Sequence, residues 1–289
     1  MKHWIAAFRL KTLPLALGAI ILGSSLPRFE FRFEIFALAA ITAILLQILS
    51  NLANDYGDFK KGTDKHRKDR QLGGGNITPK AMLTAIWFFT ILTLAAGIYL
   101  LFVAFANNWE YWLKFLGLGI ACIIAAISYT VGKKAYGYYG LGDIFVFIFF
   151  GLVGVLGTAF LYDQQIHHYN FFPAIAYGCL CVGVLNVNNI RDLDKDVLTN
   201  KITFASKLGK NGALAYQILL LVIAFISVLT HHFLSIYMSL APFSILAIGY
   251  VHIKKLQVAE TAEEYNKQLK FLSIGSLAIV LLFLLKIYY

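Results

Sequence analysis

Long apolar runs separated by short polar segments restrict what this chain can fold into. The segment Asn211–Ile253 contains 43 residues without a Lys, Arg, Asp or Glu. A helix needs roughly 20 mostly apolar residues to cross the hydrocarbon core of a bilayer. This segment is therefore long enough for two membrane-spanning helices, and the polar residues His231, His232 and Ser235 predict the turn between them.

The same pattern recurs along the whole chain. Of the 289 residues, 59% are hydrophobic and 14% are charged, whereas about a quarter of an average soluble domain is charged. This composition excludes a disordered chain, a secreted disulfide scaffold and an ordinary soluble enzyme. The sequence predicts an all-α, polytopic membrane protein, a single domain over residues 1–289 with nine transmembrane helices. Besides the two helices above, the predicted spans are Leu13–Leu26, Ile35–Asn54, Ala81–Trp109, Phe115–Gly132, Ile144–Tyr162, Gln164–Ile190 and Phe271–Leu285.

Positive charge is distributed unevenly between the two sides of this predicted bundle. If the chain starts in the cytoplasm, all but four of its 25 Lys and Arg residues fall in cytoplasmic segments; the exceptions are Arg28, Arg32, Lys114 and Lys286. The positive-inside rule therefore predicts a multi-pass protein of the cytoplasmic (inner) membrane with its N-terminus inside. A net charge of +10 then reflects orientation and contact with anionic lipid or substrate, and we expect no nucleic-acid partner. A cleaved signal peptide is the alternative for the first run, but its removal would disturb this charge alternation.

Carboxylates are concentrated in two short segments that each follow a predicted helix. Seven of the 15 acidic residues lie there: Asp55, Asp58, Asp64 and Asp69 after the second helix, and Asp192, Asp194 and Asp196 after the sixth. Positions three or four apart share a helix face. Asn51 and Asn54 therefore point the same way as the first two aspartates, and Asn188 points the same way as Asp192 and Asp196.

Carboxylates stacked in this way repel one another unless a cation joins them. Mg²⁺ is typically held by a few carboxylates together with substrate phosphate oxygens. Two facing clusters at one membrane face therefore predict a site for a Mg²⁺-bound diphosphate with a cytoplasmic opening. Arg70, Lys133, Arg191 and Lys201 lie in the same loops and would complement phosphate charge. The alternative is that these basic residues are solvated loop charges.

Three motifs in these segments resemble those of the intramembrane aromatic prenyltransferases, the UbiA superfamily. Asn54-Asp55-Tyr56-Gly57-Asp58 is similar to the family's NDxxD signature, Asp192–Asp196 to its DxxxD signature, and Tyr129–Lys133 to its YxxxK element. The likeness covers nearly the whole chain. Within the family, it is strongest to the members that prenylate 1,4-dihydroxy-2-naphthoate in menaquinone synthesis, over the stretches Arg9–Pro14, Asn51–Asp64, Gly140–Gly151 and Asn188–Gly209.

The resemblance implies a reaction and a set of residues for it. A polyprenyl group would pass from polyprenyl diphosphate to 1,4-dihydroxy-2-naphthoate with loss of carbon dioxide, giving demethylmenaquinol. Asp55, Asp58, Asp192 and Asp196 would hold Mg²⁺, and Lys133 would stabilise the leaving diphosphate. The expected substrate-binding residues are Asn51, Asn54, Arg70, Tyr129, Asn188, Arg191, Lys201, Arg9 and Lys11.

Other functions stay open on the sequence alone. The acceptor of the same reaction would alternatively be 4-hydroxybenzoate or another phenol. A membrane transporter is a different class, although transport sites tend to lie near the bilayer midplane and these acids cluster at one face. A non-catalytic membrane scaffold would have no need for paired Asn/Asp faces.

Overall fold

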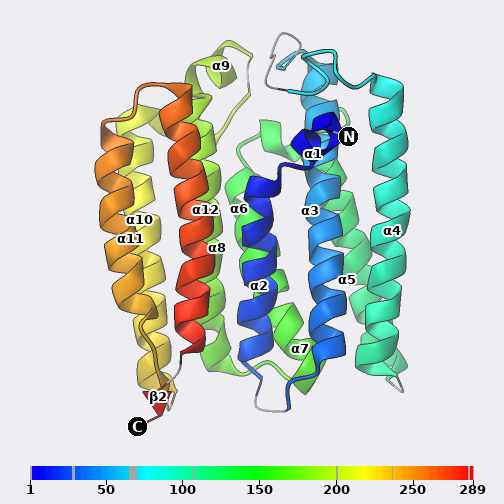
Figure 1. The fold of residues 1–289 in the computed structure, drawn as a ribbon, viewed down its shortest axis with the longest axis vertical. Coiled ribbons are helices and arrows are strands. Elements are labelled where there is room, and N and C mark those ends of the chain that lie inside the picture. Colours follow the sequence, from blue (N-terminus) through cyan, green and yellow to red (C-terminus); the bar gives the residue numbers. More distant parts are fainter. Residues whose placement is uncertain are drawn as a thin grey trace.

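Long helices run side by side through the full height of the molecule in the computed structural model of the chain (Figure 1). It describes residues 2–27, 30–64, 70–106, 108–199, 201–235, 237–285 and 287–288; Asp69 of the first acidic segment lies outside them. The helices are α1 (Lys2–Phe8), α2 (Leu13–Ser25), α3 (Phe33–Lys61), α4 (Pro79–Phe105), α5 (Trp109–Ser128), α6 (Gly142–Val146), η3 (Phe147–Gly157), α7 (Thr158–Asp163), α8 (Phe171–Arg191), α9 (Leu193–Leu198), α10 (Phe204–Leu234), α11 (Ala241–Gln257) and α12 (Ala262–Leu284).

Single-turn helices and one short strand occupy parts of the connections between these helices. Three single-turn helices are η1 (Leu10–Thr12), η2 (Tyr136–Tyr138) and η4 (His168–Asn170). The strands β1 (Tyr237–Met238) and β2 (Ile287–Tyr288) pair in antiparallel fashion beyond the ends of α10 and α12. Apart from this pair of two-residue strands, every element of the described residues is helical, which confirms the predicted all-helical membrane fold.

Eight helical segments among the described residues are long and apolar enough to cross a membrane. The ninth long helix, α11, has 17 residues and packs against α10 and α12, so the predicted total of nine spans stays a prediction. The predicted turn after His232 is confirmed, because α10 ends at Leu234. The first turns of α10 begin at Phe204, where Thr203 and Ser206 cap each other's backbone. Gly209 then interrupts the helix with a non-helical backbone, φ 68° and ψ 174°, just before the predicted apolar run begins at Asn211.

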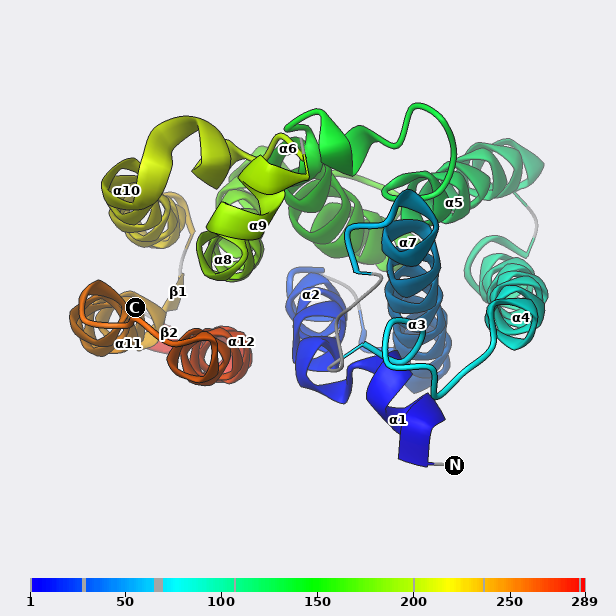
Figure 2. The same cartoon turned by 90° about the horizontal axis from the view of Figure 1, so that it is seen from above.

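The helices form two groups when the bundle is seen along its axis (Figure 2). α8, α10, α11 and α12 lie on one side and α3, α4 and α5 on the other, with α2 and the α6–α7 segment between them. A chain of buried polar side chains crosses the first group. Asn186 donates to Gln217, Gln217 contacts His252, and His252 contacts Gln268. Each of these residues lies on a different helix, so the chain ties α8, α10, α11 and α12 together.

The segment from Gly142 to Asp163 is one continuous span whose middle is not an α-helix. Its central 11 residues, Phe147–Gly157, are π-helical, a form that is rare and often found at functional sites. Glycine permits close packing here, since a Cβ on Gly151 would come within 2.7 Å of the Ala174 carbonyl oxygen. The side of this helix that faces α2 and α5 lines the cavity described next.

Candidate active site

A cavity of about 410 Å³ lies between α2, α3, α4, α5, the α6–α7 segment and α8. Its walls within the bundle are mostly apolar. At one end, where α3 finishes and α8 passes into α9, the lining becomes polar and charged. Both predicted acidic clusters reach this end: Asp58, Asp192 and Asp196 line the cavity, and each is at most 8% exposed.

The first cluster occupies the last turns of α3. Asn51, Asn54 and Asp58 line the cavity, as their helical spacing predicts. Asn51 is held in place because its amide donates to the Phe8 carbonyl oxygen at 2.9 Å and to Thr12 Oγ1 at 3.2 Å. Asp55 is 2% exposed and does not line the cavity; the backbone N–H groups of Gln71 and Leu72 lie against its carboxylate.

Tight packing fixes the helix end that carries this cluster. A Cβ on Gly57 would lie 2.4 Å from Thr130 Oγ1, a distance that a real side chain does not tolerate. Thr130 in turn donates to the Ala53 carbonyl oxygen at 3.0 Å. The glycine in Asn54-Asp55-Tyr56-Gly57-Asp58 therefore lets the end of α3 approach the segment that follows α5.

The second cluster lies at the junction of α8 and α9. Arg191 does not line the cavity but organises the residues that do. Its guanidinium donates to both oxygens of Asp192, at 3.0 and 2.6 Å, and to Asn188 Oδ1 at 2.9 Å. A further bond to Asn266 Oδ1, 2.7 Å long, anchors it to α12. Arg191 is thus a positioning residue for Asp192 and Asn188.

Lys201 lies between the two clusters. Its Nζ is 3.9 Å from Asp196 Oδ1, and its side chain is only 14% exposed. Burial lowers the pKa of Lys201, but the negative charges of Asp58 and Asp196 outweigh it and raise the pKa above the usual lysine range. The Lys201 ammonium therefore stays charged at the polar end of the cavity.

Lys133, predicted to contact the diphosphate, is exposed and does not line the cavity. Tyr129, four residues earlier, does. The backbone turns at Gly132, where φ is +99°, and leaves Lys133 at the surface. Burial raises the pKa of Tyr129 to about 12, so its hydroxyl stays protonated and able to donate.

Sequence reasoning missed Tyr138, which contacts both the first acidic segment and the segment that follows α9. Its hydroxyl donates to Asp58 Oδ1 at 2.7 Å and lies 2.8 Å from Thr63 Oγ1. Lys61 Nζ and Lys201 Nζ lie 3.9 and 5.3 Å from the centre of its ring. The available signal was the Tyr136-Gly-Tyr-Tyr stretch close behind Tyr129, which is unusually aromatic for a loop.

Three further cations lie near this end. Arg9 lines the cavity, adopts a left-handed backbone with φ of +49°, and has a buried Nη2 without a hydrogen-bond partner among the described residues. Arg70 also lines the cavity and pairs with the buried Asp64 at 2.9 Å. Lys11 is exposed and is not part of the lining; its carbonyl oxygen accepts a bond from Ser273.

The oxygen donors at this end suit Mg²⁺ in kind. No group of three or more His, Cys, Asp or Glu side chains within the described part of the chain is close enough to hold a metal ion alone. Asp55 Oδ1, however, is buried and has no hydrogen-bond partner among those residues. Mg²⁺ is usually bound through one or two carboxylates plus substrate phosphates, so the clusters fit ions whose coordination a diphosphate completes.

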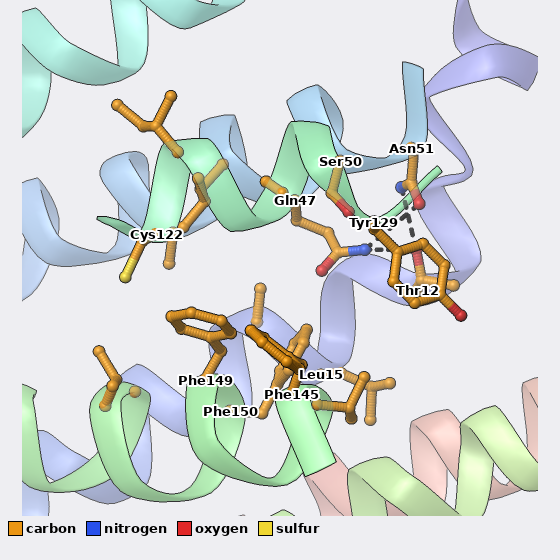
Figure 3. Close-up of a pocket in the computed structure, with 18 of the residues that line it drawn as sticks. Thr12, Leu15, Gln47, Ser50, Asn51, Cys122, Tyr129, Phe145, Phe149 and Phe150 are labelled. Carbon is orange, nitrogen blue, oxygen red and sulfur yellow. Dashed lines mark hydrogen bonds between the residues drawn. The ribbon is translucent and has the colours of Figure 1, made fainter. Parts of the chain in front are cut away.

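Away from the charged end, the cavity has two unlike walls (Figure 3). Gln47, Ser50 and Asn51 of α3 lie on one wall, and Phe145, Phe149 and Phe150 lie opposite them. Tyr136 stacks on Phe145 with 3.9 Å between ring centres, and Phe145 lies 5.9 Å from Phe149. The aromatic wall of this part of the cavity suits a flat ring or an allylic cation.

Comparison with known proteins places this cavity in context. The UbiA prenyltransferase family profile matches residues 12–282. The chain is 42% identical to a 1,4-dihydroxy-2-naphthoate octaprenyltransferase of Haemophilus influenzae, with 78% of this chain and 75% of that protein covered. An enzyme of the same name from Mycobacterium tuberculosis is 34% identical, with 86% of each chain covered.

Solved structures share the fold at low sequence identity. A UbiA homologue from Aeropyrum pernix superposes with a TM-score of 0.73 at 17% identity, covering 96% of this chain and 99% of that chain. One from Archaeoglobus fulgidus, bound to DMAPP and Mg²⁺, gives 0.63 at 13% identity, covering 96% and 98%.

Proposed function

The chain belongs to the UbiA prenyltransferase family, and on that premise we propose that it transfers a polyprenyl group from polyprenyl diphosphate to 1,4-dihydroxy-2-naphthoate. The carboxylate is lost as carbon dioxide and the product is demethylmenaquinol. The acceptor follows from relatives of that specificity at 34 to 44% identity. The single observation that carries the chemistry is that residues of both acidic clusters line one end of a cavity whose other walls are mostly apolar.

Binding of the diphosphate is the task of the charged end. Asp58, Asp192 and Asp196, with Asp55 beside them, would hold Mg²⁺, which supplies charge neutralisation for the diphosphate when bound. Lys201 lies beside these carboxylates and would balance the negative phosphate charge that Mg²⁺ does not neutralise. Tyr129 donates from the neighbouring wall. Asn54 and Asn188 offer amide groups to the same ligand.

Transfer takes place at the border between the charged and aromatic parts. The bond between C1 of the prenyl group and the diphosphate oxygen breaks, and pyrophosphate leaves with the electron pair. Phe145 and Phe149 face the allylic cation and exclude water. A ring carbon of the acceptor bonds to C1, and the ring recovers an electron pair when its carboxylate departs as carbon dioxide.

Arg9 is the cation placed best to attract the acceptor carboxylate. Its guanidinium lines the cavity and has an unused Nη2, and its backbone is fixed in a left-handed turn between α1 and η1. Lys11, at the surface, would contribute only to the general positive potential. The uneven Lys and Arg distribution supports a cytoplasmic opening of the site in the inner membrane.

One acceptor panel tests this function. Membranes containing the protein receive a radiolabelled allylic diphosphate, Mg²⁺ and, in separate reactions, carboxyl-labelled 1,4-dihydroxy-2-naphthoate or 4-hydroxybenzoate. We expect prenylated product and labelled carbon dioxide in equal amounts from the naphthoate. Prenylation of 4-hydroxybenzoate without turnover of the naphthoate would reassign the acceptor. Absence of any prenylated product would reject the transferase.

A further inference from the structure

One polar pair interrupts the apolar wall of the cavity below its charged end. Gln47 and Ser50 are three residues apart on α3, so they share a face, and both line the cavity. They lie opposite Phe145 and Phe149 (Figure 3). Polar side chains inside a membrane span are costly and usually mark a site of function. Nothing in the diphosphate site described above requires them.

Their hydrogen bonds are incomplete. The Gln47 amide nitrogen donates to Asn51 Oδ1 at 3.3 Å and to Thr12 Oγ1 at 3.5 Å, but within the described residues no donor reaches Gln47 Oε1. Ser50 Oγ makes no hydrogen bond to any residue that the structure describes. A carbonyl acceptor and a hydroxyl therefore face the cavity with capacity to spare.

Threonines elsewhere in the lining behave differently. The hydroxyls of Thr42, Thr93 and Thr158 each donate to a carbonyl oxygen one turn back in their own helix, at 2.8, 2.6 and 2.7 Å. Such back-bonding satisfies the hydroxyl and leaves an apolar surface toward the cavity. The contrast singles out Gln47 and Ser50 as groups prepared for a ligand.

The pair also lies at a suitable depth. Ser50 and Gln47 precede Asp58 by eight and eleven residues, which corresponds to roughly 12 and 16 Å along the axis of α3. The distance between Asp58 and the pair therefore accommodates the reacting carbon of a bound diphosphate and an aromatic ring next to it. Such a flat ring would rest on Phe145 and Phe149 and turn one edge toward Gln47 and Ser50 on α3.

We infer that Gln47 and Ser50 form the subsite for a ring hydroxyl of the aromatic acceptor, an inference that rests on the proposed function. Gln47 Oε1 accepts a hydrogen bond from that hydroxyl, and Ser50 Oγ forms a second hydrogen bond with the same hydroxyl. Because Gln47 Oε1 repels a carboxylate, the subsite takes the 4-hydroxyl of 1,4-dihydroxy-2-naphthoate, remote from the carboxylate. The pair thereby selects para-dihydroxylated rings over rings with one hydroxyl.

Two ligands that differ by this hydroxyl test the subsite. For wild type, Gln47→Leu and Ser50→Ala, the naphthoate substrate is varied to obtain its KM, and 1-hydroxy-2-naphthoate is added as a competitor to obtain its inhibition constant. We expect the KM to rise about five- to tenfold in the variants, the range for loss of a hydrogen bond. The inhibition constant should stay within about twofold, because that analogue has no group for the subsite. The KM for the prenyl diphosphate should also be unchanged.

Gln217→Leu is the matched control. Gln217 is likewise an intramembrane glutamine, but it is fully buried in the polar chain between Asn186 and His252 and does not line the cavity. This variant should lose thermal stability and keep both acceptor constants. If Gln47→Leu behaves like Gln217→Leu, Gln47 only braces α3 against Thr12 and the inference is overturned.

Two further results separate the inference from its premise. Equal increases in the KM and in the inhibition constant would show a general distortion of the cavity, and would overturn the subsite. If the wild-type protein turns over the naphthoate but the KM is unchanged in both variants, the subsite is overturned and the proposed function stands. A wild-type protein that does not turn over the naphthoate would overturn the proposed function, and the subsite with it.

Discussion

The hydroxyl of Tyr138 donates a 2.7 Å hydrogen bond to Oδ1 of Asp58. Through this contact, the loop that follows α5 reaches the acidic end of α3. The same loop also meets the segment after α9, since the Ile202 amide donates to the Tyr138 carbonyl oxygen at 3.2 Å. Tyr138 therefore links the first acidic segment to Ile202, in the segment that follows α9, although the two are far apart in sequence.

Tyr138→Phe should weaken use of the metal while leaving the fold intact. The variant removes the donor that orients the Asp58 carboxylate, and loss of such a supporting bond typically costs about 10- to 100-fold in metal affinity or activity. We expect the Mg²⁺ concentration for half-maximal activity to rise by about this factor. A titration of activity against Mg²⁺ measures it, and an unchanged midpoint would show that Asp58 needs no such orientation.

The two lysines should differ sharply. Lys201→Ala removes a buried cation between the clusters and should lower kcat/KM for the prenyl diphosphate about 10- to 100-fold, or about 1.4 to 2.8 kcal/mol of transition-state stabilisation. Lys133→Ala removes an exposed charge and should stay within about threefold of wild type. Steady-state kinetics with the diphosphate varied decide the matter. A larger loss of kcat/KM for Lys133→Ala than for Lys201→Ala would place Lys133 in the site, as its motif predicts.

The acidic end of α3 should not tolerate a larger residue at position 57. Gly57→Ala places a methyl group against Thr130 Oγ1, and overpacking of this kind costs typically about 1 to 3 kcal/mol. We expect a lower melting temperature together with at least a tenfold loss of activity. Gly117→Ala is the control, because a Cβ there has nothing within 4 Å. Similar behaviour of the two variants would disprove the close approach.

Because Tyr129 acts as a hydrogen-bond donor, its contribution to kcat/KM should not change with pH over the range in which its hydroxyl stays protonated. Burial raises the pKa of Tyr129 to about 12, so the neutral, donating form persists as the pH rises to 9.5. The ratio of kcat/KM between wild type and Tyr129→Phe should therefore be constant from pH 7 to 9.5. A ratio that falls toward one above pH 8.5 would show that the hydroxyl ionises there.

Local patterns in the sequence were sufficient for much of this picture. Helical spacing put Asn51, Asn54 and Asp58 on one face, because that inference needs only the geometry of one helix. It failed to place Asp55 beneath the backbone of Gln71 and Leu72, since the path of a loop depends on what it packs against.

Contacts between distant segments were beyond reach for the same reason. Choosing between Lys133 and Lys201 requires knowing how the chain turns at Gly132 and how the segment after α9 folds back. The Lys201 amide donates to the Asp196 carbonyl oxygen at 2.8 Å, which returns that lysine to the acidic end. No motif encodes this return, nor the bond between Tyr138 and Asp58.

The cooperation of the two acidic clusters on one Mg²⁺-bound diphosphate is tested most directly by a double-mutant comparison. Mg²⁺-dependent release of pyrophosphate from an allylic diphosphate and 1,4-dihydroxy-2-naphthoate is measured for wild type, Asp58→Asn, Asp192→Asn and the double variant, each checked for an unchanged melting temperature. Because residues that act as a unit are not additive, each single variant should lose at least about 10³-fold and the double variant little more. Near-wild-type release by either single variant, or losses that simply multiply in the double variant, would contradict the account.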